Sequence, residues 1–220
     1  MRRRYSLRLF ACATVAAVFA ACSGRQEAER SLEPLPSQPL SAYAARPLIV
    51  LPVRYVRPAD SLGWAGQIPE SRAYLQTVDT EIAFAVGERG VKELWVFADE
   101  LARSVKRNVN YAPDPYTLAA QSLRPPLRRL PELLPDPLAA QLRSLVALHD
   151  ARYGLIPVEI RFERAGAGSA GRAVLHLVLV DARLAKPIWM GEVVSDTMST
   201  FSPALAASIA ERLADLVGSR

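Results

Sequence analysis

The clearest hydrophobic pattern lies in the last third of the chain, where three segments have the character of β-strands. Apolar and charged residues alternate strictly from Val158 to Glu163, which is typical of a strand with one face in water. Ala173 to Asp181 is a longer and almost wholly apolar segment, and Ile188 to Val194 is a third. Because the glycine-rich stretch Ala165 to Gly171 and the short stretch Ala182 to Pro187 connect them, we predict an antiparallel meander.

Helical spacing of apolar residues follows this meander. Ser202-Pro203 provides an N-cap and a residue well tolerated at the first helical position, and Gly218 ends the pattern. The residues expected on the buried face of this helix are Leu205, Ile209, Leu213 and Leu216.

The first half of the folded part predicts a strand followed by helices. The apolar run Leu48 to Val53 is typical of a strand buried on both faces. Helical spacing then recurs at Leu75, Val78, Ile82 and Val86, and we expect this helix to end near Arg89. Val91 to Phe97 is compatible with a strand and Ala98 to Asn108 with a helix, although the two segments could also form one helix.

Prolines dominate the middle of the chain. Residues 110–135 carry six of them, so this insertion is expected to be mostly irregular, with one short helix around Tyr116 to Ser122. Asp136-Pro137 then opens a helix with apolar residues on one side. The predicted fold class is α/β, a mixed sheet with a carboxy-terminal three-strand antiparallel meander and helices packed on it.

The amino terminus has the layout of a secretory signal. Four arginines lie within residues 1–8, an apolar stretch runs from Leu9 to Phe19, and small residues precede Cys22. The stretch is shorter than the roughly 20 residues that a spanning helix needs. Phe19-Ala20-Ala21-Cys22 resembles the bacterial lipobox, with Phe19 where leucine is usual. This resemblance implies cleavage after residue 21, lipidation of Cys22, and anchoring by acyl chains in a membrane.

The predicted domain organisation has three parts. Residues 1–21 are the lipoprotein signal peptide, and residues 22–46 are the lipidated cysteine and a disordered tether, because this segment is polar and contains prolines. Residues 47–220 form a single α/β domain with the proline-rich insertion 110–135. An aspartate directly after the lipidated cysteine resembles an inner-membrane retention signal, but residue 23 is serine. Outer-membrane sorting, with the domain facing the periplasm, is therefore favoured.

The order of predicted elements resembles a domain shared by the curli-secretion lipoprotein, lipoprotein activators of penicillin-binding proteins and the amino-terminal domain of TolB. In that group an early apolar strand contains a proline, as Leu48 to Val53 does here. A later strand ends in aspartate before a short turn, and the next begins with an aromatic residue, as at Asp181 and Trp189. The resemblance implies an envelope protein that binds other proteins or forms pores and is not an enzyme, although fold does not fix function.

Charge and candidate chemistry narrow the function further. Four of the 27 basic residues lie in the leader, which leaves 23 against 22 acidic residues, so we expect no nucleic-acid partner. His149 and His176, the only histidines, have no partners at metal-ligand spacing, and no Gly-x-Ser-x-Gly occurs. We therefore expect no catalytic residues, no metal and no cofactor.

The candidate binding residues are aromatic and basic. Loop aromatics are frequent anchors of protein interfaces, although those named here could also pack on the sheet. The arginines of the proline-rich insertion could hold an anionic partner, or belong to a solvated loop. The predicted partner-binding residues are Trp64, Tyr111, Tyr116, Arg124, Arg128 and Arg129. The leading hypothesis is a non-catalytic adaptor or assembly factor that binds another envelope protein; the alternative is a lipoprotein that binds a small ligand or glycan.

Overall fold

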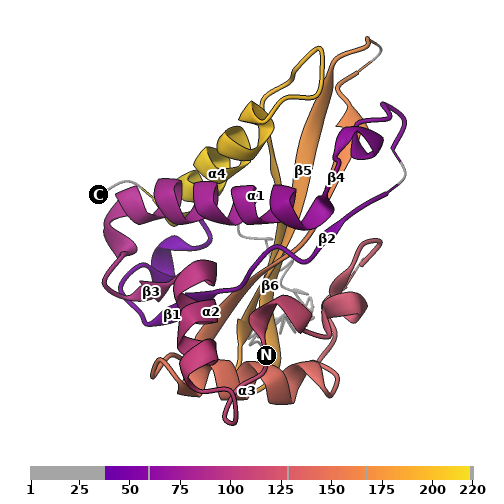
Figure 1. The fold of residues 1–220 in the computed structure, drawn as a ribbon. Coiled ribbons are helices and arrows are strands. Elements are labelled where there is room, and N and C mark those ends of the chain that lie inside the picture. The colour runs from indigo at the N-terminus through magenta and orange to yellow at the C-terminus, as the bar shows by residue number, and fades with distance from the viewer. Residues whose placement is uncertain (1–37, 59, 128, 167, 219–220) are drawn as a thin grey trace, which may run out of the picture. The chain divides into compact units, whose positions relative to one another are not determined.

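A long antiparallel hairpin forms the centre of the sheet. In the computed structural model, which describes residues 38–58, 60–127, 129–166 and 168–218, β4 (Tyr153–Arg164) pairs with β5 (Gly171–Asp181). On its other side β5 pairs with β6 (Lys186–Val194), also antiparallel. The predicted meander is therefore confirmed, and its three strands run together in orange tones in Figure 1.

Short parallel strands complete the other half of the sheet. β1 (Leu48–Val50) lies between β4 and β3 (Trp95–Val96), parallel to both. β2 (Tyr55–Val56) pairs with β4 further along its length. The strand predicted from Leu48 to Val53 is thus shorter than expected, and the chain resumes pairing at β2 after an interruption that contains Pro52. The order is β3, β1, β4, β5, β6, a mixed sheet as predicted.

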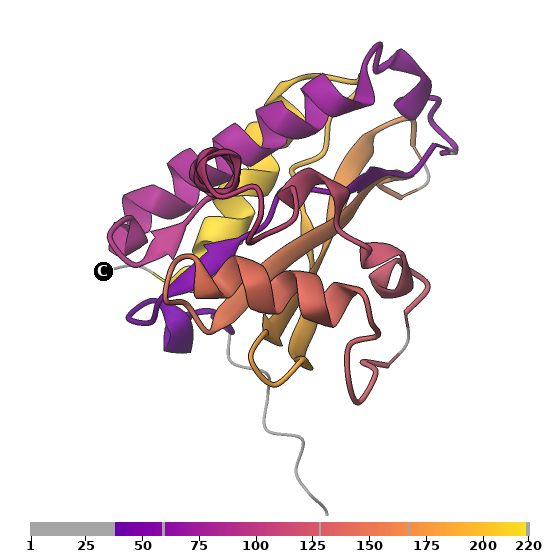
Figure 2. The same cartoon turned by 60° about the horizontal axis from the view of Figure 1, so that its bottom comes forward.

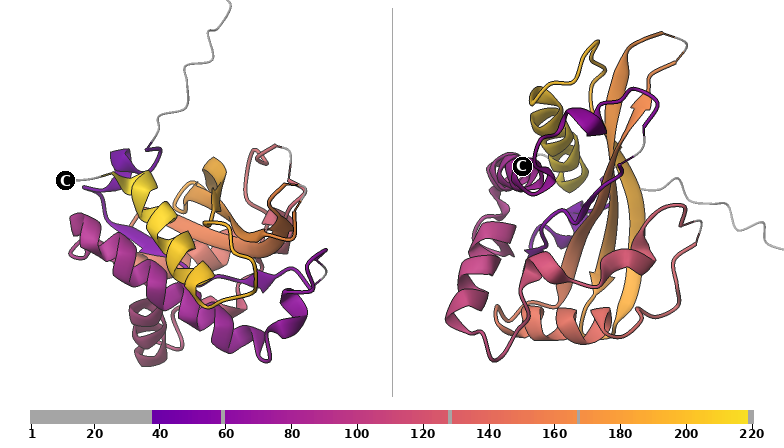
Figure 3. Two further views of the ribbon diagram at one scale, coloured as in Figure 1. Left: turned by 90° about the horizontal axis from the view of Figure 1, so that it is seen from above. Right: turned by 45° about the vertical axis from the view of Figure 1, so that its right-hand side comes forward.

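Helices cover both faces of this sheet. α1 (Ser71–Val86) and α4 (Ala204–Val217) run side by side on one face (Figures 1 and 3). α3 (Leu138–Ala147) crosses the opposite face (Figure 2), and α2 (Ala98–Arg107) contributes to the same side of the core. The strand and helix at residues 95–107 are separate elements, which resolves the alternative of one merged helix.

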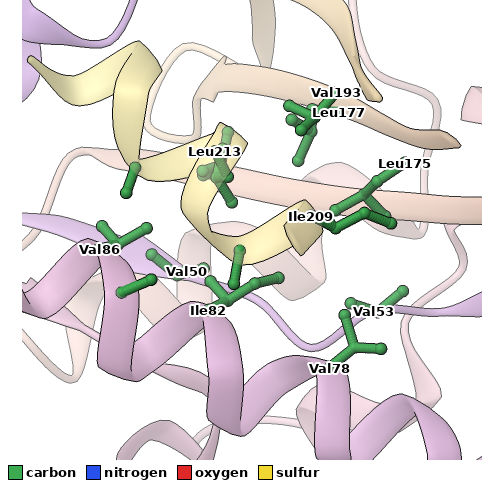
Figure 4. Close-up of a cluster of buried hydrophobic side chains, with 14 of the residues drawn as sticks. Val50, Val53, Val78, Ile82, Val86, Leu175, Leu177, Val193, Ile209 and Leu213 are labelled. Atoms are coloured by element: carbon green, nitrogen blue, oxygen red, sulfur yellow. The ribbon is translucent and has the colours of Figure 1, made fainter. Parts of the chain in front are cut away.

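The core under α1 and α4 is built as their periodicity predicts. Figure 4 shows valine, leucine and isoleucine side chains of the two helices meeting those of β5, β6 and the β1 segment. In α4 the predicted Leu205, Ile209 and Leu213 are fully buried, whereas the predicted Leu216 is partly buried and packs against this core. Each such side chain contributes on the order of 2 kcal/mol through the apolar surface that it removes from water.

The expectation of one wet face on the strand from Val158 to Glu163 is wrong for its first half. β4 begins at Tyr153, and every residue from Tyr153 to Ile160 is buried. The register shifts between Pro157 and Glu159, and such a bulge accommodates a proline inside a sheet. The predicted strand from Val91 is also too long, because β3 has only two residues.

Residues 38–46 belong to the folded part, although their polar composition predicts a tether. Leu40 is completely buried in the core under α1 and α4, and its backbone N–H donates to the carbonyl oxygen of Leu216 at 3.0 Å. Ser41–Tyr43 form a short 3-10 helix. The remainder of the predicted tether and the signal peptide lie outside the described residues.

The proline-rich insertion is mostly irregular, as expected. Among its described residues it contains two short 3-10 helices, Pro115–Thr117 and Ala120–Leu123, in place of the single predicted helix. Leu118, Leu123 and Leu134 are buried against the same face of the sheet as α3. The insertion is therefore part of the core layer.

Candidate functional site

The segment 108–116, which follows α2, carries two of the predicted partner-binding residues. It is held by local hydrogen bonds: the Asn108 amide donates to the Ser104 carbonyl oxygen at 2.9 Å, and the Tyr111 N–H donates to the Asn108 carbonyl oxygen at 2.9 Å. Ala112 is buried. We call this segment the 108–116 loop.

The tip of the 108–116 loop exposes apolar surface. Tyr111 is 76% exposed and Val109 is 70% exposed. The loop lies between two hollows. One, of about 470 Å³, is bounded by α1, α2 and the loop and includes Val109 and Tyr116 in its lining. The other, of about 580 Å³, is bounded by the loop and α3 and is lined in part by Tyr111 and Leu148.

Tyr116 lines the first hollow and is partly buried. The Asp114 carboxylate accepts a hydrogen bond from the Tyr116 N–H at 2.9 Å, which fixes the start of the short 3-10 helix. The Arg72 guanidinium lies 5.8 Å from the centre of the Tyr116 ring. Burial raises the pKa of the Tyr116 phenol, and the negative charges of Asp79, Asp99 and Asp114 raise it further.

Asp79 is a buried carboxylate beside this hollow. It lies on α1, is 8% exposed, and accepts a hydrogen bond from the Val53 N–H at 2.8 Å. Val53 lies in the segment between β1 and β2, where the strand pairing is interrupted. The Asp79 carboxylate therefore replaces a missing strand partner for its N–H. The other oxygen, Oδ2, has no partner among the described residues. Burial raises the pKa of Asp79 to about 7, although the Val53 hydrogen bond acts in the opposite direction.

Asp79 is missing from the sequence-predicted site, yet the sequence contains a signal for it. The helix α1 has an apolar stripe at Leu75, Ile82 and Val86, and position 79 falls on that same stripe. A carboxylate at such a position must be buried, which marks it for attention.

Arg124 lies away from this hollow, in an internal ion pair. Its Nε donates to Glu159 Oε2 at 2.7 Å, and Arg57 Nε donates to Glu159 Oε1 at 2.8 Å. The Arg124 guanidinium also stacks 4.6 Å from the centre of the Tyr55 ring. Glu159 is 1% exposed, so two arginines neutralise a buried carboxylate on β4. Arg129 is exposed, and Arg128 lies outside the described residues.

Trp64 is placed on the other face of the sheet. It is 4% exposed and makes edge contacts with Phe162 and Phe201, with ring centres 6.0 Å and 6.3 Å apart. Trp64 therefore packs on the sheet, which is one of the two alternatives that the sequence left open. An exposed anchor role does not fit this burial. Of the three predicted aromatic residues, Tyr111 and Tyr116 lie on the 108–116 loop and line separate hollows.

The histidines do not form a site with other ligands. His176 is buried on β5, with Nδ1 3.8 Å from Glu192 Oε1, and burial lowers its pKa. His149 is partly buried just after α3, and burial lowers its pKa as well. Within the described ranges, no group of three or more histidine, cysteine or carboxylate side chains could hold a metal ion. In this same part of the chain, no helix has the length and apolar character needed to cross a membrane.

Comparisons with known proteins find likenesses of structure only. No family model and no curated protein matches the chain. It is similar to the PelC dodecamer from Paraburkholderia phytofirmans, with 12% identity and a TM-score of 0.42 over 80% of this chain and 90% of that one. It is also similar to the LpoB C-terminal domain from Salmonella enterica, with 14% identity and a TM-score of 0.35 over 72% of this chain and 93% of that one. LpoB from E. coli matches at 11% identity and a TM-score of 0.36, over 74% and 66%.

The strand and helix order on which the resemblance to the envelope lipoprotein domain rests is present in the structure, with β1 and β3 shorter than expected. No partner, assembly or activity of this chain follows from these likenesses.

Proposed function

We propose that this chain is a lipid-anchored protein of a bacterial envelope that acts as a non-catalytic adaptor or assembly factor by binding another envelope protein. The observation that carries the proposal is Tyr111, 76% exposed on a hydrogen-bonded loop between two hollows. Protein interfaces use such aromatic residues as anchors, and concave surfaces beside them receive side chains of the partner. The partner surface is the 108–116 loop with Tyr116 and the two hollows.

The anchor is the diacylglyceryl and acyl lipid on Cys22, after removal of residues 1–21. Residues 22–37 then tether the folded part to the outer membrane on its periplasmic side. The folded part includes residue 38 and those that follow. The lipobox-like Phe19-Ala20-Ala21-Cys22 supports this assignment. Incorporation of labelled palmitate into the full chain, and its loss in Cys22→Ser, tests the anchor; equal labelling of both, or of neither, contradicts it.

The partner is tested by photo-crosslinking in the living envelope. A photoreactive phenylalanine analogue replaces Tyr111 in the full-length chain, and the captured protein is identified by mass spectrometry. Leu184, which is 60% exposed in the turn between β5 and β6, provides a matched control for the same replacement. We expect one envelope protein to be captured from position 111 and not from position 184.

Two further variants make this experiment decisive. Tyr116→Ala removes a ring that lines the first hollow and is expected to reduce capture from position 111 at least tenfold. Cys22→Ser is expected to abolish capture, because it releases the chain from the membrane on which the partner resides. Capture that is equal at positions 111 and 184, or none at either position, contradicts the adaptor proposal.

Binding of a small ligand or glycan is the second candidate function. It is favoured by the size of the first hollow, about 470 Å³, which falls within the range of roughly 300–1,000 Å³ usual for ligand pockets. A ligand extracted with the purified chain, and absent from preparations of Tyr116→Ala, would support this candidate over the adaptor.

A further inference from the structure

The first hollow has an apolar part and adjoins an acidic depression. Its apolar part, between α2 and the 108–116 loop, is lined by Ala102, Val105, Val109, Ala112 and Pro113. An adjoining depression of about 420 Å³ lies against α1 and is lined in part by Asp79 and Thr80. Gln76, Asp99 and Tyr116 line both. We call the two together the Tyr116 groove.

Acceptor groups gather at the α1 end of the groove. Asp79 and Asp99 are carboxylates, Gln76 has an amide oxygen, and Tyr116 has a hydroxyl and a ring face. Asp79 Oδ2 is buried without a partner among the described residues, which leaves an acceptor that the fold itself does not use. Asp99 Oδ2 lies 2.8 Å from Arg103 Nη1 in an ion pair. Because the Asp99 side chain is 81% exposed, it remains open to a second donor.

We propose that the Tyr116 groove binds a lysine side chain of the protein partner, with its methylene stem on the apolar part and its ammonium at Asp79. This inference rests on the proposed adaptor function and names the chemistry of its partner. The contacts come from Val105 and Ala112 below the stem, and from Asp79 and Tyr116 around the ammonium.

Lysine fits the groove better than the other charged side chains. Arg72 and Lys106 line the first hollow, but the depression against α1 is lined by Asp79 and Asp99 and by no cation among the described residues. An acidic side chain placed there would meet these two carboxylates, which are close enough to Tyr116 to raise its pKa. Arginine presents a planar fork that is matched by two coplanar acceptor oxygens, whereas Asp79 has one oxygen free, because the other accepts from Val53. An ammonium is compact, and the face of Tyr116 adds cation–π attraction.

Reaching Asp79 requires a small movement of side chains. The carboxylate is 8% exposed, so a side chain at the mouth of the depression must rotate before the ammonium makes contact. Gln76 is exposed and lines this mouth, which leaves it free to change rotamer. Such rotamer changes at interfaces are common when two proteins bind.

The test uses blocked pentapeptides that differ only in their central residue. The full chain, purified in detergent micelles with methyl-labelled valine, is titrated with acetyl-Ala-Ala-Lys-Ala-Ala-amide and with its norleucine analogue, which keeps the stem and lacks the charge. We expect the lysine peptide to shift the methyl resonances of Val105 and Val109, and the norleucine peptide to bind at least tenfold more weakly.

Substitutions locate the charge that the peptide recognises. Asp79→Asn keeps the shape and is expected to weaken the lysine peptide about tenfold, with little effect on the norleucine peptide. Glu81→Gln, two residues further along α1, is the matched control and leaves both affinities unchanged. The methyl spectra verify that each variant is folded. Equal binding of the two peptides, or undiminished binding of the lysine peptide by Asp79→Asn, overturns the lysine site.

The outcomes separate the lysine site from the adaptor function. Capture of a partner from position 111 together with equal binding of the two peptides overturns the lysine site and leaves the adaptor in place. Selective binding of the lysine peptide without any capture supports the site and contradicts the adaptor. When both results are positive, Asp79→Asn is expected to reduce capture as well.

Discussion

Replacing Asp79 by asparagine is expected to make the stability of the chain less dependent on pH. Burial raises the pKa of Asp79 from its ordinary value of 3.8 to about 7 in the folded chain. Between these two values the folded state binds a proton that the unfolded state has released. The free energy of unfolding therefore falls as the pH rises from about 4 to about 7, and then becomes constant.

The size of this effect follows from the shift. Each pKa unit corresponds to about 1.4 kcal/mol, so roughly three units give a loss of about 4 kcal/mol at neutral and higher pH. About two of these units lie between pH 5 and pH 8, and hence the loss in that window is about 3 kcal/mol. Asparagine resembles the protonated carboxyl, since its oxygen still accepts from the Val53 N–H. Because asparagine does not ionise, this loss in the free energy of unfolding disappears in the variant.

Urea unfolding of the full chain, followed by circular dichroism at about pH 5 and about pH 8, measures this difference. The free energy of unfolding of the unsubstituted chain is expected to fall by about 3 kcal/mol more than that of Asp79→Asn between about pH 5 and about pH 8. Glu81→Gln serves as the control, because Glu81 is a partly exposed acid on the same helix. The reasoning is refuted if the difference between Asp79→Asn and the unsubstituted chain does not change with pH, or if Glu81→Gln behaves in the same way.

Further predictions concern the buried ion pair, the segment before β1 and one glycine of β5. Glu159→Gln removes the charge that holds Arg57 and Arg124 and is expected to cost about 2–4 kcal/mol in urea unfolding, whereas Arg124→Ala costs about 1 kcal/mol because Arg57 still pairs; equal costs would contradict this. Leu40→Ala is expected to cost about 2–4 kcal/mol, since Leu40 is completely buried; a change below about 0.5 kcal/mol would return residues 38–46 to the tether. Gly171→Ala is expected to lower the melting temperature by several degrees, because its added methyl group would lie 2.8 Å from the Trp64 ring and also meet Leu62; an unchanged melting temperature would mean that these side chains move away freely.

Much of the fold could be predicted from the sequence because it depends on neighbours along the chain. The two-residue period of strands and the 3.6-residue period of helices placed the meander, α1, α2 and α4 within a few residues. The signal peptide, Cys22 and the tether up to residue 37 are also local patterns; they lie outside the described residues and stay predictions. Charge counts work in the same way, since they need no three-dimensional contacts.

The candidate site could be predicted only in part. Tyr111 and Tyr116 were found because turn and proline signals placed them in an irregular segment, where aromatic residues are often presented to partners. Trp64 has the same signals but is buried against Phe162 and Phe201, residues nearly 100 and more than 130 positions away. A pattern within one segment has no information on such distant packing.

Only the tertiary structure decided the electrostatic environment. The sequence by itself determines that Glu159 alternates with apolar residues, which predicted a solvated carboxylate. Folding instead brings Arg57, 102 positions away, and Arg124, 35 positions away, onto its two oxygens. Asp79 likewise becomes an unusual acid only because folding buries it beside the segment between β1 and β2, where it accepts from the Val53 N–H. Desolvation and pairing depend on which distant segments cover a group, so the sequence determined which residues are available and the fold determined their charge and partners.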